Sequence, residues 1–304
     1  MKIHNSCPYC KGNASKYVVS NDINQKITEL EFTYYRCNIC GLIFLNPIPA
    51  DIQKYYGQEY PAYRVEDINK EVTDYDLGKI AIVKRYAHGK KLLEIGPGGG
   101  TFAHMAKQEG FIVDAIEMDA GCCKFLKESI KIQRVVNTTD VVGSLDKLEG
   151  EYDVIVMWHV LEHLKNSWEV MRSLARLLAT GGIIILAVPN PDALQFRLFK
   201  KYWKHLDAPR HVAFVPMNLM AKEMSRHGLE TVAITTNDEV SRVFNNFGWW
   251  LNSLGSFTSE SSSKFLNSIL KKRRIAQIIY LLAVGWLEKV DGNGNAYLAV
   301  FRRK

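Results

Sequence analysis

The chain has 304 residues, 47% of them hydrophobic and 23% charged, which suits one medium globular domain with a small accessory module. The net charge is +7, and because residues 1–150 hold 19 basic and 19 acidic side chains, the basic excess lies in the second half. Six cysteines and no apolar leader predict a cytoplasmic protein. No apolar stretch reaches the roughly 20 residues of a membrane-spanning helix, so no transmembrane segment is expected.

Two CxxC pairs open the chain, Cys7 with Cys10 and Cys37 with Cys40. Each pair forms a tight turn that presents two thiolates, and two such turns complete a tetrahedral zinc shell. Between them, residues 16–35 alternate apolar and polar side chains as two short strands would. This pattern predicts a zinc ribbon, whose four ligands leave no open position, so the Zn²⁺ would be structural. The alternatives are a pair of disulfides or a redox dithiol.

From Lys91 onward, apolar strands alternate with helical segments, which predicts an α/β domain with a mostly parallel seven-stranded sheet. The expected strands are Lys91–Ile95, Ile112–Glu117, Gln133–Asn137, Tyr152–Met157, Gly182–Val188, Glu230–Thr236 and Tyr297–Arg302.

A glycine-rich turn follows the first of these strands. It reads Glu94-Ile-Gly96-Pro-Gly98-Gly-Gly100, and the helix after it begins near Phe102. Glycines there let the backbone approach a ligand closely at a helix N-terminus. The spacing is ExGxGxG, whereas a dinucleotide site requires GxGxxG, and this favours the methionine end of S-adenosylmethionine (SAM) over a pyrophosphate.

Further acidic residues lie at the end of the next strand and shortly after the one that follows it. Glu117 lies about twenty residues after the turn, where a carboxylate accepts hydrogen bonds from ribose hydroxyls, and Met118 follows it. Asp140, after the third strand, lies where an adenine amino group is expected. A solvated loop acid is the alternative for Glu117.

These motifs resemble those of class I SAM-dependent methyltransferases, over residues of about 75 to 236. The closest subgroup resembled pairs this domain with an N-terminal CxxC…CxxC module and is common in bacterial cell-surface polysaccharide and natural-product pathways. The resemblance implies a Rossmann-like fold and assigns SAM binding to Gly96, Gly98 and Glu117. It is carried by the segments 94–100, 152–163, 178–182 and 188–190 together with Glu117.

The domain boundaries follow from these motifs. We expect a zinc ribbon in residues 1–46, a helical linker or lid in 47–88 and the SAM-binding domain in 89–304. Within that domain, 191–216 would form the acceptor side and 238–295 a helical insertion.

His159-Val-Leu-Glu162-His163 matches the HxxEH pattern of zinc peptidases, in which both histidines share one helix face. We reject that interpretation because the segment directly follows an apolar strand at the expected cofactor edge. His159 is expected to contact SAM. His163 is either a packing residue or an acceptor-side group.

The acceptor side contains Pro209-Arg210-His211. Similar family members have a comparable stretch on the loop over the acceptor. An imidazole titrates near neutral pH, so His211 is the expected base for a hydroxyl acceptor, with His163 and His205 as alternatives. Arg210 is expected to hold a carboxylate or phosphate. Alternatively, Arg210 and His211 brace the helix that follows.

The sequence thus favours O-methylation of a small-molecule or sugar acceptor, including anionic and lipid-linked precursors. The alternatives are N- or C-methylation, an RNA methyltransferase that uses the zinc ribbon, and a non-catalytic SAM-binding scaffold. Nucleic acid is the less favoured partner.

The apolar segment Ile275–Trp286 follows the basic run Lys271–Arg274, which predicts a helix packed either on protein or on the inner membrane face.

Overall fold

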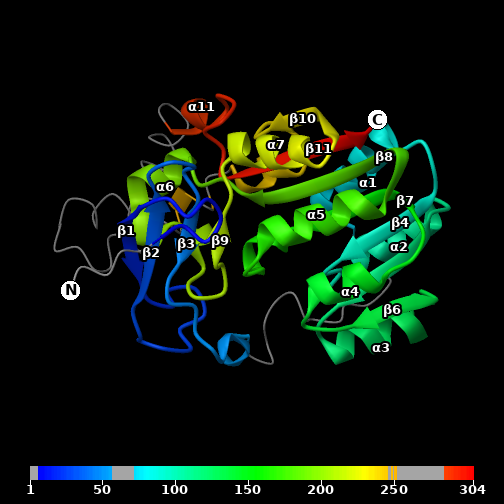
Figure 1. Cartoon of the computed structure of the whole chain (residues 1–304), viewed down its shortest axis with the longest axis horizontal. Helices are drawn as coiled ribbons and strands as arrows, with labels where there is room; N and C mark the ends of the chain where they lie inside the picture. Colours follow the sequence, from blue (N-terminus) through cyan, green and yellow to red (C-terminus); the bar gives the residue numbers. More distant parts are fainter. Residues whose placement is uncertain (1–5, 57–71, 246–247, 249, 252–283) are drawn as a thin grey trace.

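The computed structural model describes residues 6–56, 72–245, 248, 250–251 and 284–304. In this part of the chain the strands form two sheets that lie side by side, a small one built mainly from the N-terminal residues and a large one built from the rest (Figure 1). The candidate site lies at the carboxyl ends of the central strands of the large sheet.

The large sheet has seven strands in the order β10-β11-β8-β7-β4-β5-β6. Neighbours from β6 to β8 are parallel, and β11 is antiparallel to both β8 and β10. This confirms the predicted Rossmann-like α/β fold and its seven strands. The bounds are β4 Lys91–Ile95, β5 Ile112–Glu117, β6 Arg134–Asn137, β7 Tyr152–Trp158, β8 Leu178–Pro189, β10 Leu229–Thr235 and β11 Ala296–Arg303.

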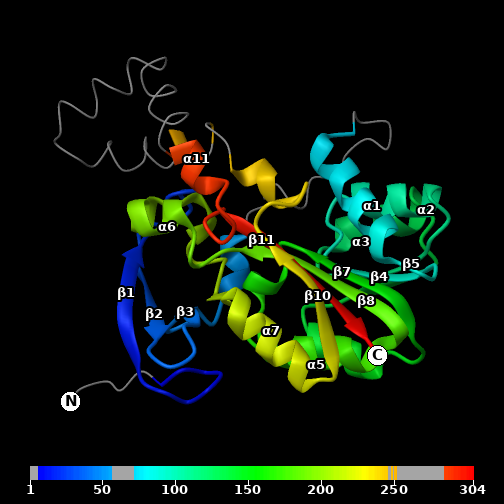
Figure 2. The same cartoon turned by 90° about the horizontal axis from the view of Figure 1, so that it is seen from above.

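Helices cover both faces of this sheet (Figure 2). Successive side chains of a strand point to opposite faces, so Leu92 of β4 packs in one hydrophobic cluster and Leu93 in the other. The Leu92 face is covered by α1 (Asp74–Tyr86), α2 (Thr101–Gln108) and α3 (Ala120–Glu128). The Leu93 face is covered by α4 (Val141–Lys147), α5 (Ser167–Leu177) and α7 (Met217–Arg226).

Side chains cap three of these helices at their N-termini. The Thr73 hydroxyl accepts the Asp76 N–H at 3.3 Å in a capping box for α1. Asp119 accepts the Cys122 N–H at 2.8 Å for α3, and Asp140 accepts a backbone N–H for α4. Such caps satisfy backbone donors that have no partner within the helix.

The small sheet has the order β1-β2-β3-β9. Its first three strands are β1 Ala14–Ser20, β2 Phe32–Cys37 and β3 Ile43–Leu45, and the fourth, β9 Ala213–Phe214, comes from the second half of the chain. Ile43 pairs with Phe214 across the antiparallel β3–β9 ladder. The core of this sheet likewise combines N-terminal side chains with later ones such as Trp203.

The remaining described elements are short helices: η1 Ile52–Tyr55, η3 Leu161–His163, α6 Leu194–Phe199, η4 Lys200–Tyr202, η5 Lys204–Leu206, η6 Ser241–Phe244 and α11 Gly285–Glu288. The run Lys271–Arg274, most of the predicted helix Ile275–Trp286 and much of the expected 238–295 insertion lie outside the described residues, as does part of the expected linker 47–88. Among the described residues, no helix has the length and apolar character needed to cross a membrane.

Candidate cofactor and acceptor site

The glycine turn lies directly after β4. Gly96, Gly98 and Gly100 have φ values of 70°, 53° and 79°, in the left-handed region that favours glycine. A Cβ on Gly96 would also lie 2.5 Å from a methyl group of Val160, so a side chain does not fit there. A Cβ on Gly100 would meet Ile130 at 2.4 Å, which makes Gly100 the position where the turn packs against the protein interior.

Glu117 ends β5 beside this turn. Its side chain is buried, and its Oε2 accepts the Gly98 N–H at 2.9 Å. Its Oε1 accepts the N–H groups of Met118 and Asp119 at 2.6 and 2.9 Å. The carboxylate therefore holds the turn after β4 and the end of β5 in one arrangement.

A pocket opens where β4, β5, β6 and β7 end. β4 lies between β5 and β7, where the strand order reverses, and open α/β sheets bind ligands at such switch points. Six residues singled out in the sequence meet in its lining: Gly96, Gly98, Glu117, Met118, His159 and His163.

Three other predicted cofactor residues are not in the lining. Gly100 packs inside, and Asp140 accepts the Gly143 N–H at 2.9 Å as the cap of α4. Glu94 is buried, and its Oε2 has no hydrogen-bond partner in the described part of the chain. Burial raises the pKa of Glu94 to about 8, although the Lys79 ammonium opposes the shift.

A cluster of histidines surrounds a buried carboxylate at the β7 end of the pocket. Oε1 of Glu162 lies 3.3 Å from Nδ1 of His159 and 4.0 Å from Nε2 of His211. The rings of His163 and His211 are 4.5 Å apart, centroid to centroid. Burial raises the pKa of Glu162, but the neighbouring histidines outweigh it and hold the pKa below its usual value. No role for Glu162 was expected from the sequence, although its place between two histidines was a visible signal.

The histidines of the cluster differ in their hydrogen bonds. Nδ1 of His211 lies 2.6 Å from the carbonyl oxygen of His205, and a carbonyl only accepts, so this Nδ1 carries the proton. Nδ1 of His163 lies 3.0 Å from the Tyr56 hydroxyl and 3.1 Å from the Arg210 carbonyl oxygen. Burial and His211 together lower the pKa of His163 to about 4.

The HxxEH segment is not a zinc-peptidase helix. Only Leu161–His163 forms a short 3₁₀ helix, and His159 precedes it with φ of 57°. The two histidines therefore do not share a helix face. Glu162, His163 and His211 instead offer ligand atoms within 4.8 Å of one another, a spacing that a metal ion could use.

Arg210 has a different environment from the one expected for an acceptor-binding arginine. Its side chain is fully buried, and its guanidinium donates to both oxygens of Asp207 at 2.9 and 2.8 Å. It also donates to both oxygens of Asp22 at 3.2 and 2.5 Å and to the Tyr55 carbonyl oxygen at 3.1 Å. These bonds use the guanidinium as a link between the small sheet and the acceptor segment, so we assign Arg210 a positioning role.

The four predicted zinc ligands also lie together. The Sγ atoms of Cys7, Cys10, Cys37 and Cys40 are within 4.8 Å of one another. Burial raises the pKa of the Cys37 thiol, but the backbone N–H groups of Cys40 and Ile39 outweigh it and bring the pKa to about 7. Four thiol groups at this spacing, with backbone donors aimed at one sulfur, suit Zn²⁺.

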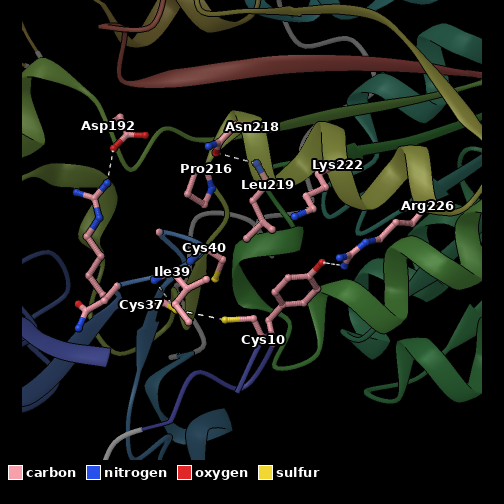
Figure 3. Close-up of a pocket in the computed structure, with 14 residues that line it drawn as sticks. Cys10, Cys37, Ile39, Cys40, Asp192, Pro216, Asn218, Leu219, Lys222 and Arg226 are labelled. Atoms are coloured by element: carbon pink, nitrogen blue, oxygen red, sulfur yellow. Dashed lines mark hydrogen bonds and ion pairs between the residues drawn. The ribbon is translucent and has the colours of Figure 1, made fainter. Parts of the chain in front are cut away.

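A cavity of about 800 Å³ separates part of this cysteine cluster from α7 (Figure 3). Arg226 of α7 donates to the Tyr9 hydroxyl, and that hydroxyl donates to Glu223 of the same helix. On the other side, Arg36 pairs with Asp192 at 2.9 Å. The cysteine turns are therefore tied to the second half of the chain by polar contacts as well as by the β3–β9 pairing.

Comparison with known proteins identifies the family of the central part of the chain. The family model described as "Methyltransferase domain" matches residues 74–234. A ubiquinone biosynthesis O-methyltransferase of Escherichia coli is 28% identical over 139 residues, which cover 44% of this chain and 54% of that protein. The chain therefore spans about half the length of the curated relatives it matches.

Two solved structures are also similar, at lower sequence identity. A SAM-dependent methyltransferase from Archaeoglobus fulgidus has a TM-score of 0.49 at 17% identity, over 76% of this chain and 95% of that one. Coclaurine N-methyltransferase, solved with N-methylheliamine and SAH, has a TM-score of 0.48 at 15% identity, over 84% of this chain and 81% of that one.

Proposed function

The chain belongs to the methyltransferase-domain family, and we propose that it is a SAM-dependent methyltransferase that methylates a hydroxyl group of a small molecule or sugar. The observation that carries this proposal is the histidine–glutamate cluster beside the glycine turn. SAM is already activated as a sulfonium, so the protein must align the acceptor and, for a hydroxyl, remove its proton. A relative named as an O-methyltransferase adds support.

We further propose cell-surface carbohydrate or secondary-metabolite biosynthesis as the setting, which rests on the subgroup that the sequence resembles. The test is transfer of a labelled methyl group from SAM to a panel of nucleotide-activated hexoses and simple phenols. We expect label in at least one hydroxyl acceptor. Label only in RNA, lost steeply as salt rises, would overturn the proposal.

For the cofactor, we propose that Gly96, Gly98, Glu117 and Met118 contact SAM. Glu94, Gly100 and Asp140 then support the turn and the neighbouring helix from behind. Replacing Glu117 by alanine should weaken SAM binding more than tenfold, about 1.4 kcal/mol, because charge-assisted hydrogen bonds are lost. Titration calorimetry measures this, with Glu128→Ala on the exposed surface of α3 as the control. Equal affinities for both variants would contradict the assignment.

For the metal, we propose one structural Zn²⁺ per chain on Cys7, Cys10, Cys37 and Cys40. Metal analysis should find one equivalent of zinc in the purified protein and little in Cys37→Ser. The control is Cys122→Ser, which removes a buried thiol in α3 and should keep the metal. Protein without stoichiometric zinc would remove the proposal.

A further inference from the structure

We propose that His159, oriented by the carboxylate of Glu162, is the base that takes the acceptor proton, an inference that rests on the proposed O-methyl transfer. The sequence favoured His211 for this role and assigned His159 to SAM contact. In the structure, His159, His163 and His211 differ in the groups that lie near their ring nitrogen atoms.

His159 lies where β7 meets the cofactor pocket. Its backbone N–H donates to the Ala187 carbonyl oxygen at 2.8 Å, and the residue has φ of 57°. This left-handed conformation is uncommon for a residue with a side chain, and such conformations gather at functional sites. The ring stacks on His205 at 5.7 Å and meets the edge of Phe244 at 4.8 Å, which fixes its plane.

The charge of Glu162 favours one tautomer of the His159 ring. Nδ1 of His159 lies 3.3 Å from Oε1 of Glu162 without forming a hydrogen bond to it, and the negative charge of the carboxylate favours a proton on this nitrogen. Nε2 then has a lone pair. This Nε2 is buried and has no hydrogen-bond partner in the described residues. A buried polar atom without a partner is costly, and a hydroxyl bound in the pocket would supply the missing donor.

The other two histidines of the cluster are less suited. Nε2 of His211 faces Glu162 at 4.0 Å, and His211 is not part of the pocket lining. His163 lines the pocket, but its pKa of about 4 makes it a weak proton acceptor near neutral pH. Neither ring forms a hydrogen bond to Glu162, whereas Nδ1 of His159 lies 3.3 Å from its carboxylate, an arrangement of base and neighbouring carboxylate.

Proton transfer to His159 accompanies methyl transfer to the acceptor oxygen. The acceptor hydroxyl gives its proton to Nε2 of His159 while its oxygen forms a bond to the methyl carbon of SAM. The bond between that carbon and the sulfonium sulfur breaks, and its electron pair goes to sulfur, which leaves neutral S-adenosylhomocysteine. His159 ends as an imidazolium beside the Glu162 carboxylate and releases its proton to solvent.

The first test needs no acceptor. Nitrogen-15 NMR of histidine-labelled protein in complex with S-adenosylhomocysteine reports the tautomer of each ring, and His159→Asn assigns the signals. Asparagine tolerates a left-handed backbone, so this variant should keep the local conformation. We expect His159 to carry its proton on Nδ1 and to lose that preference in Glu162→Met. A proton on Nε2 in the wild-type protein would overturn the proposal.

The second test is the rate of methyl transfer at saturating SAM with a hydroxyl acceptor from the hexose and phenol panel. His159→Asn should lower the rate roughly 100-fold to 10,000-fold, while SAM affinity stays within about threefold. The matched control is His88→Asn, at an exposed histidine outside the site, which should retain the wild-type rate.

Three outcomes separate the possible failures. A wild-type rate in His159→Asn contradicts the role of His159 and leaves the proposed function intact. Wild-type protein that methylates amines or RNA but no hydroxyl contradicts the proposed function itself. Activity that a chelator abolishes and Mg²⁺ restores would overturn the role of His159, because a metal at Glu162, His163 and His211 would then activate the acceptor.

Discussion

Two buried charged clusters lie next to each other and have opposite character. The Arg210 guanidinium donates hydrogen bonds to both carboxylate oxygens of Asp22 and to both of Asp207. Around Glu162, both carboxylate oxygens are buried and lack a hydrogen-bond partner in the described residues. The polar groups of the Arg210 cluster form hydrogen bonds that hold the structure together. The carboxylate oxygens of Glu162 remain available to a ligand. Adjacent positions in the chain, Arg210 and His211, therefore serve different purposes.

The largest expected effect is on the Arg210 cluster. Arg210→Leu should lower the free energy of unfolding by about 3 to 5 kcal/mol, because it leaves two buried carboxylates without their cation. Urea denaturation at neutral pH measures the change. The control is Arg36→Leu, which breaks a half-exposed pair with Asp192 and should cost about 1 kcal/mol or less. Similar losses in the two variants would contradict the structural role assigned to the Arg210 cluster.

The second effect concerns His163 and pH. Its folded pKa of about 4 lies below the ordinary value of 6.5, so the unfolded chain binds the proton more readily and stability is lost as pH falls from 6.5 towards 4. Between pH 7 and pH 5 this loss should reach about 2 kcal/mol. His163→Phe should show a shallower decline than wild type in urea titrations at the two pH values, whereas His88→Phe should not.

The third effect tests Asp207 at lower pH. Burial raises its pKa, but Arg210 and its other partners outweigh this and bring the pKa to about 2, below the ordinary 3.8. A depressed carboxyl pKa contributes stability that is present above 3.8 and lost as pH falls towards 2. From pH 5 to pH 2.5 the loss should be about 1.5 kcal/mol. Asp207→Asn should remove that part of the acid dependence, and an unchanged slope would contradict the assignment.

The smallest expected effect is on Glu162. Glu162→Gln should change the free energy of unfolding by less than about 1 kcal/mol, because the carboxylate has a costly buried charge and few bonds to lose. The matched variant Asp22→Asn removes one charge from the Arg210 cluster and should cost at least about 2 kcal/mol. Thermal or urea unfolding compares them directly. A greater loss for Glu162→Gln would mean that Glu162 is mainly structural.

The sequence was sufficient for the large sheet because its signals are local. Each parallel strand is a short apolar run. The glycine turn directly follows β4, and Glu117 is the last residue of β5. The close approach of the four cysteines was also predictable from the sequence, because it requires only that two CxxC turns face each other.

The rest depends on contacts between distant residues. The partner of Arg210 is Asp22, in a loop of the small sheet, and no local pattern links the two. The left-handed conformation of His159 is likewise not evident from an apolar strand sequence. For the same reason the sequence favoured His211, which stands beside Arg210 in the chain but turns its Nε2 towards Glu162.

The pairing of β3 with β9 has a consequence for the order in which the protein folds during synthesis. Ribosomes make the chain from the N-terminus, so Ile43 is exposed long before Phe214, its ladder partner, has been made. Until then, the backbone groups of β3 that face β9 must bond to water, and the aromatic core of the small sheet lacks Trp203 and Phe214. The pairing of β3 is therefore completed only after residues some 170 positions further along the chain have been made.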